Sequence, residues 1–134
     1  MPIDIRVDSA ERVRYSYVRG VVTDAEVIDA YEQVVDDPNF DPTLDVIADM
    51  TGVVRLEVTA NRVRELAERR ARNARLNAAR PRVAIVAPTD VMFGIARMYE
   101  SSGPRDDGTR RYLVCRTMDE ARAWLSLPDR PDSV

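Results

Sequence analysis

The side chains that could do chemistry in this chain are limited by two absences. The 134 residues contain no His and no Lys, so all 20 basic residues are Arg. Without Lys no Schiff base can form, and without His no imidazole can move protons near neutral pH. Arg stays protonated, so it can hold anions but hardly acts as a base. Catalysis would rest on carboxylates, Tyr, hydroxyls or Cys115, and no nucleophile stands with a base. We therefore expect no enzyme activity.

Metal and thiol chemistry are also disfavoured. Zinc sites usually draw on Cys and His, and Cys115 is the one cysteine, which also excludes an internal disulfide. Its place in an apolar strand predicts a buried, inert thiol. Residues 37–41 match the start of a calcium loop, but Pro42 and Ala48 stand where Gly and Glu are needed. We expect no metal site and no cofactor.

Four polar residues fall where strands end and helices begin. Asp49 closes a predicted strand, Thr59 opens a helix, and Thr89 and Asp90 open the next one. Ligands of parallel α/β sheets bind outside the carboxyl ends of the strands, and helix N-termini attract anions. Ordinary helix capping explains the same residues, and it is the favoured interpretation for Thr89 and Asp90. For Thr59 both interpretations stay open.

Positive charge is concentrated in residues 62–82. This segment holds eight Arg against two Glu, a net charge of +6, so with −3 overall the remaining chain carries −9. Such a segment could grip phosphate, nucleic acid or an acidic partner, or it could be a solvated helix face. It contains no aromatic residue. We therefore favour a solvated face or a protein partner and expect no nucleic-acid binding.

Hydrophobic periodicity predicts the elements that must position these residues. Strands are expected over 3–8, 13–22, 44–49, 82–87 and 111–116. Helices are expected from Thr23 to about 36, over about 59–79, from about 89 to 100, and from Thr117 onward. Loops are expected around Gly52 and over 101–109. The order ββαβαβαβα predicts one α/β domain over 1–127, with a mixed, mostly parallel sheet of about five strands and helices on its faces. Residues 128–134 read as a frayed tail.

Three helices have apolar faces that should pack inward or against a partner. The first helix presents Val27, Ala30, Tyr31, Val34 and Val35. The second presents Val63, Leu66, Ala67, Ala71 and Ala74. The third is apolar nearly all round, which predicts a homodimer through Phe93, Arg97, Met98 and Tyr99. No signal peptide or membrane span is visible, so a cytoplasmic location is the default expectation.

Three stretches resemble the STAS/SpoIIAA-like family over roughly Arg19 to Leu125. The segment 49–53, Asp-Met-Thr-Gly-Val, is similar to the family's D-L-S-G-V. Segments 93–99 and 120–125 resemble its larger uncharacterised branch, which also resembles the lipid-binding Sec14 domain in outline. The resemblance implies an α/β domain of a regulatory protein.

The resemblance also places a candidate phosphorylation site. In the family's anti-sigma-factor antagonists a D-S-S-G motif follows, and its second Ser is phosphorylated. The matching stretch here is Glu57-Val58-Thr59-Ala60. Glu57 keeps the acid and Thr59 keeps a hydroxyl, whereas Val58 and Ala60 depart from the motif. Thr59 is therefore a candidate phospho-acceptor, with a helix cap as the alternative.

Two functional hypotheses follow. The leading one is a non-enzymatic regulatory or protein-interaction module, and it predicts a shallow, exposed edge at Thr59. The alternative is a domain that binds a small anionic nucleotide or a lipid near the carboxyl ends of the strands. It predicts a deep apolar pocket with convergent polar groups.

Overall fold

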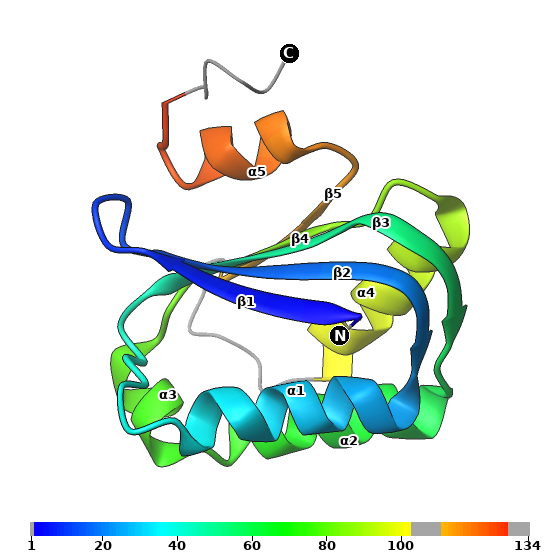
Figure 1. Ribbon diagram of the computed structural model, residues 1–134, viewed down its shortest axis with the longest axis horizontal. Coiled ribbons are helices and arrows are strands. Elements are labelled where there is room, and N and C mark those ends of the chain that lie inside the picture. The colour runs from blue at the N-terminus through cyan, green and yellow to red at the C-terminus, as the bar shows by residue number, and fades with distance from the viewer. Residues whose placement is uncertain (1, 103–110, 129–134) are drawn as a thin grey trace.

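The computed structural model describes residues 2–102 and 111–128. Their elements are β1 (Ile3–Asp8), β2 (Val13–Thr23), α1 (Asp24–Asp36), β3 (Asp45–Glu57), α2 (Ala60–Ala71), α3 (Ala74–Ala79), β4 (Val83–Val86), α4 (Asp90–Ser102), β5 (Tyr112–Cys115) and α5 (Met118–Trp124) (Figure 1). The predicted loop 101–109 lies outside the described residues from 103 onward. Residues 129–134 of the predicted tail also lie outside them, so the domain boundary at 127 stays a prediction.

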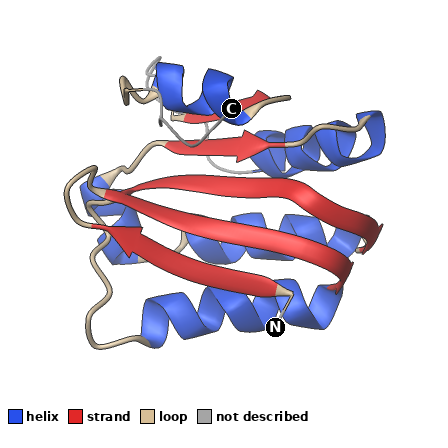
Figure 2. Ribbon diagram, turned by 45° about the horizontal axis from the view of Figure 1, so that its top comes forward, coloured by secondary structure: helices blue, strands red, loops and turns tan. Residues whose placement is uncertain are grey.

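One five-stranded sheet organises the molecule, in the order β1-β2-β3-β4-β5. β1 runs antiparallel to β2, and every other neighbouring pair is parallel. Helices α1, α2, α3 and α4 lie on one side of the sheet, and α5 lies on the other (Figure 1). Figure 2 shows the strands as one continuous layer between them. The predicted mixed α/β sheet is confirmed.

The two faces of the sheet divide the core. Along β4, Val83 and Ile85 pack on the side of α4, while Ala84 and Val86 pack on the side of α5. All four residues are buried. This arrangement explains why the strand is apolar without alternation, since a central parallel strand is covered on both faces.

The predicted end of the third strand at Asp49 is wrong, as is the loop around Gly52. β3 continues to Glu57 because β2 pairs with it as far as Thr23↔Glu57. At Gly52, a Cβ would lie 3.0 Å from the Cβ of Arg19, so the glycine allows close approach of the two strands. Gly20 stands at a register shift of β2 with φ of +71°, a left-handed conformation that favours glycine.

The predicted single helix over 59–79 is also wrong, because it is divided into α2 and α3. The Asn73 side chain accepts hydrogen bonds from the backbone N–H groups of Arg75 and Leu76, both at 3.1 Å, and so caps a new helix. The observed order is therefore ββαβααβαβα. The break rotates Ala74 outward to an exposed position and leaves Leu76 buried in its place.

Candidate functional site: an apolar cavity under the sheet

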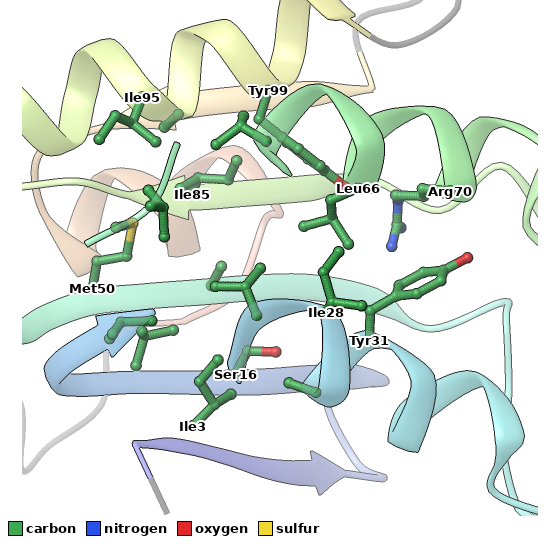
Figure 3. Close-up of a pocket in the computed structure, with 18 of the residues that line it drawn as sticks. Ile3, Ser16, Ile28, Tyr31, Met50, Leu66, Arg70, Ile85, Ile95 and Tyr99 are labelled. Carbon is green, nitrogen blue, oxygen red and sulfur yellow. The ribbon is translucent and has the colours of Figure 1, made fainter. Parts of the chain in front are cut away.

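A cavity of about 240 Å³ lies between the sheet and helices α1, α2 and α4. Its walls are mostly aliphatic, as the close-up in Figure 3 shows. Representative lining residues are Ile3, Val18, Ile28, Met50, Leu66 and Ile85. Met50 and Ile95 lie toward one end of this view, and Tyr31 and Arg70 lie toward the other. The cavity is thus a mostly apolar space between the sheet and its helices that is partly open to solvent.

Helix α1 covers one side of the cavity, and its apolar face points into it. Val27, Ala30, Tyr31 and Val34 line the cavity, which confirms four of the five residues predicted to face inward. No residue of α1 is fully buried. Contacts at the edges of α1 help to hold it in place. For example, the Tyr31 hydroxyl donates to the Arg69 carbonyl at 3.4 Å, and Glu32 forms an ion pair with Arg69 at 2.7 Å.

Arg14, the second residue of β2, brings a buried positive charge to the cavity wall. Its exposed fraction is 5%. The guanidinium lies 5.1 Å from the ring centroid of Phe40 and donates to the Asp41 carbonyl at 3.4 Å. Burial lowers the Arg14 pKa to about 10, the charge of Arg70 lowers it too, and Asp41 partly offsets both. At neutral pH the side chain therefore remains a cation.

Arg70 reaches the same cavity from the last turn of α2. It is half-buried. Burial opposes its charge, but Tyr99, Tyr112 and Tyr31 outweigh that effect and raise the Arg70 pKa. Burial also raises the pKa of Tyr99, whose ring packs edge-on against Tyr112 at 5.8 Å. The Tyr99 phenol therefore stays neutral and Arg70 stays charged.

Arg14 and Arg70 lack the carboxylate partners that neighbouring arginines have. Within residues 2–102 and 111–128, no carboxylate lies at ion-pair distance from either guanidinium. Arg69, by contrast, pairs with Glu32, and Arg62 pairs with Glu65 at 2.7 Å. Arg14 and Arg70 thus both line the cavity, and the charge of Arg70 lowers the pKa of Arg14.

The carboxyl edge of the sheet holds Thr59 at the N-terminus of α2, as predicted for either of its roles. Thr59 Oγ1 accepts from the Arg62 N–H at 3.3 Å and donates to Asp24 Oδ2 at 3.0 Å. The Thr59 N–H donates to Asp24 Oδ1 at 2.8 Å. The Asp24 carboxylate thus joins the first residues of α1 to those of α2. Thr59 is exposed, but its hydroxyl already faces a negative charge.

The other predicted edge residues do not gather around Thr59. Asp49 accepts from the Thr51 N–H at 2.9 Å and from its hydroxyl at 2.7 Å, within β3. Glu57 pairs with Arg55 at 2.8 Å on the surface. Both carboxylates therefore have local partners.

Thr89 and Asp90 act as the capping interpretation predicts. Thr89 Oγ1 accepts from the Met92 N–H at 3.3 Å, at the start of α4. The Asp90 side chain is 98% exposed and pairs with Arg116 at 3.0 Å. Neither residue lines the cavity.

The candidate dimer surface on α4 divides into two parts. Arg97 is exposed beside Glu100, whereas Phe93 is partly buried against the core and its ring is covered by the Arg116 guanidinium at 4.2 Å. Met98 is half-buried. Tyr99 points inward and lines the cavity, so it does not belong to an outer surface.

The arginines of segment 62–82 do not form one basic face. Arg70 turns inward to the cavity, Arg75 lies over the Phe40 ring at 5.1 Å, and Arg82 pairs with Asp45 at 2.7 Å. The net charge of +6 is therefore distributed over several surroundings.

Thiol, metal and membrane features complete the survey of the site. Cys115 is buried, as predicted, and burial followed by the charge of Glu120 raises its pKa to about 11. The low reactivity of its thiol stays a prediction. In the part of the chain that the structure describes, no three His, Cys, Asp or Glu side chains are grouped to hold a metal. None of the helices described is both long and apolar enough to cross a bilayer.

No family model matches this chain, and no curated protein matches it. Several solved structures are similar to it, among them the following two. One is an uncharacterised protein from the DUF3478 family with a SpoIIAA-like fold from Shewanella loihica PV-4, with 17% identity, a TM-score of 0.56, and coverage of 92% of this chain and 91% of that one. The other is the anti-sigma factor antagonist SpoIIAA in its unphosphorylated form, with 13% identity, a TM-score of 0.56, and coverage of 90% and 94%. This chain has a SpoIIAA-like fold, as its resemblance predicts.

Sequence reasoning missed the two cavity arginines, although the signals were present. Arg14 alternates with Val13 and Tyr15, which places it on the same face of β2 as Ser16 and Val18. Arg70 follows Val63 by seven residues and Leu66 by four, so it lies on the apolar face of its helix. In both segments an arginine on an otherwise apolar face indicated a positive charge that points toward the interior.

Proposed function

We propose that this chain is a non-enzymatic regulatory module that binds an apolar small molecule in the cavity between its sheet and helices. The observation that carries the proposal is the partly open, mostly aliphatic cavity of about 240 Å³ with arginines among its lining residues. Apolar walls with a few polar groups are typical of small-molecule sites, which supports the ligand-binding alternative. The ligand lies inside the domain, however, rather than at the carboxyl edge around Thr59.

The energetics of the cavity favour a ligand. Apolar atoms that replace water against its aliphatic walls gain free energy in proportion to the apolar surface that they bury. A ligand that binds only the folded state stabilises the domain.

The surroundings of Thr59 favour a cap over a phosphorylation switch. A phosphate on its hydroxyl would replace the donor that binds Asp24 and would place about two negative charges beside that carboxylate. Binding of a regulatory protein partner, a homodimer and a cytoplasmic location, all expected from the sequence, remain parts of the proposal. Light scattering at micromolar concentration tests the dimer: a mass of one chain at every concentration would exclude it.

Decanol, an uncharged ten-carbon probe, tests the proposed cavity function directly. We expect it to raise the melting temperature of the wild-type protein and to bind in isothermal titration calorimetry. Ala30→Leu places a larger side chain into the cavity from α1 and should weaken decanol binding. Ala25→Leu changes an exposed position of the same helix and is the matched control. Equal binding by both variants would place the probe elsewhere, and binding of neither decanol nor its anionic counterpart decanoate to wild type would refute the function.

A further inference from the structure

The polar groups of the cavity are distributed unevenly along it. Asp24 and Arg62 lie in the first turns of α1 and α2, while Arg14 lies near the start of β2 and Arg70 in the last turn of α2. Arg62 and Arg70 are eight residues apart on one helix, which corresponds to about 12 Å along its axis. The cavity therefore has two polar ends separated by an aliphatic middle.

The two ends differ in whether their charged side chains have partners of opposite charge. At the first end, Arg62 pairs with Glu65 at 2.7 Å, and Asp24 accepts two hydrogen bonds from Thr59. At the second end, Arg14 and Arg70 both line the cavity, and the charge of Arg70 lowers the Arg14 pKa. No carboxylate described in the structure lies at ion-pair distance from either guanidinium. Buried cations of like charge repel each other unless an anion lies between them. The second end is therefore the one suited to an anionic group.

The residues that line the middle of the cavity indicate the chemistry of the part of the ligand that lies beyond its anionic group. Between the ends the walls are aliphatic, and Ser16 is the one neutral aliphatic hydroxyl among the lining residues. A base or sugar would leave its polar atoms without partners there, which disfavours the nucleotide alternative. A cavity of about 150 Å³ accepts benzene, so by proportion 240 Å³ accommodates roughly ten carbon atoms. This corresponds to one medium-length alkyl chain.

We infer that the cavity selects a single-chain anionic amphiphile, with its alkyl chain between the sheet and α1 and its head group bound by Arg14 and Arg70. This inference rests on the proposed function and names the ligand class. Two guanidinium groups can donate several charge-assisted hydrogen bonds to a carboxylate or a phosphate monoester.

Calorimetric titration with three ten-carbon probes tests the inference: decanoate, decyl phosphate and decanol. Decanoate or decyl phosphate should bind wild type about tenfold or more tightly than decanol, because each gains hydrogen bonds to charged groups. The stronger of the two anions identifies the head group as carboxylate or phosphate. Equal affinity for all three probes would refute the inference and leave the proposed function standing. Binding by none of them would refute both.

Variants of α2 sharpen the same test. Arg70→Met keeps the length and apolar stem of the side chain but removes its charge, so it should weaken the anionic probe about tenfold and leave decanol binding unchanged. Arg64→Met alters an exposed arginine of the same helix and should change neither affinity. Arg70→Lys restores the charge and should recover part of the loss. If Arg70→Met weakened decanol and decanoate equally, the head-group assignment would be wrong. The wild-type comparison decides the question even if Arg70→Met fails to fold.

Discussion

Each face of the sheet holds a buried arginine, and the two arginines differ in their hydrogen-bond and ion-pair partners. On the α5 face, Arg122 is 2% exposed and pairs with Glu11, while it also donates to the Tyr15 hydroxyl and to the Pro128 carbonyl at 2.7 Å. On the α1 face, Arg14 is 5% exposed, and its close partners among the described residues are the Phe40 ring and the Asp41 carbonyl, at 3.4 Å. The first arginine is neutralised within the fold, whereas the second keeps its charge available.

The packing around these arginines differs in the same way. Tyr15, Ile47, Val86 and Ala121 are fully buried beside Arg122, and Tyr15 stacks on Tyr17 with ring centroids 5.6 Å apart. No residue of α1 is fully buried on the other side. The α5 face is closely packed and its buried arginine is paired with a carboxylate, so this face stabilises the domain. The α1 face is less closely packed and its arginine has no described carboxylate partner, so this face can receive a ligand. The comparison thus separates a structural region from a binding region.

The largest expected difference between the two faces is in the unfolding free energy that is lost when each buried arginine is replaced. Arg122→Met leaves Glu11 without its buried partner and should cost about 3–5 kcal/mol of unfolding free energy. Arg14→Met removes a buried charge that no described carboxylate pairs with, so it should cost much less. Urea denaturation of both variants measures the difference. A loss of equal size in Arg14→Met would show that Arg14 is a structural residue after all.

The thiol on the α5 face should be protected by its close packing. Because the Cys115 pKa is raised from 9.0 to about 11, its thiolate fraction at pH 8 should be about a hundredfold lower than in the unfolded chain. Labelling by a thiol reagent should therefore be slow in the native protein and fast in urea. Rapid native labelling would show that this face opens readily.

The same pKa shift sets a pH dependence of stability. The folded state holds the Cys115 proton more tightly than the unfolded state, so this contribution is fully present below about pH 9 and is lost between pH 9 and 11. Cys115→Ser should reduce the loss of stability across that window. Denaturation curves at pH 8 and pH 10.5 for both proteins give the comparison.

Thr59→Ala should have the smallest effect, because it removes a surface cap. The expected cost is about 0.5–2 kcal/mol, since the Arg62 N–H loses its acceptor and Asp24 loses one donor. Thr59→Ser retains the hydroxyl and is the matched control. Mass spectrometry of the protein from its native cell, with pull-downs of wild type and Thr59→Ala, tests the switch. A phosphate on Thr59 that releases a partner would contradict the cap assignment.

Several features were predictable because they depend on neighbouring residues alone. The capping box of Thr23 and Glu26 marks the start of α1, and the Thr23 N–H donates to Glu26 Oε1 at 3.0 Å. Thr117 caps α5 in the same way, through the Glu120 N–H at 3.2 Å. The second half of β3 was not predictable, since Gly52 and its polar neighbours form a strand only by pairing with β2.

The sequence by itself determined which faces of each strand and helix turn inward, because side-chain direction repeats with the period of the element. It therefore determined the α/β class and most of the element order. Only the tertiary structure decided whether an inward face meets a neighbour or a cavity, since that volume depends on how far all the elements stand apart. The same distances brought Arg14 of β2 beside Arg70 of α2, and no local pattern in either segment specifies the other.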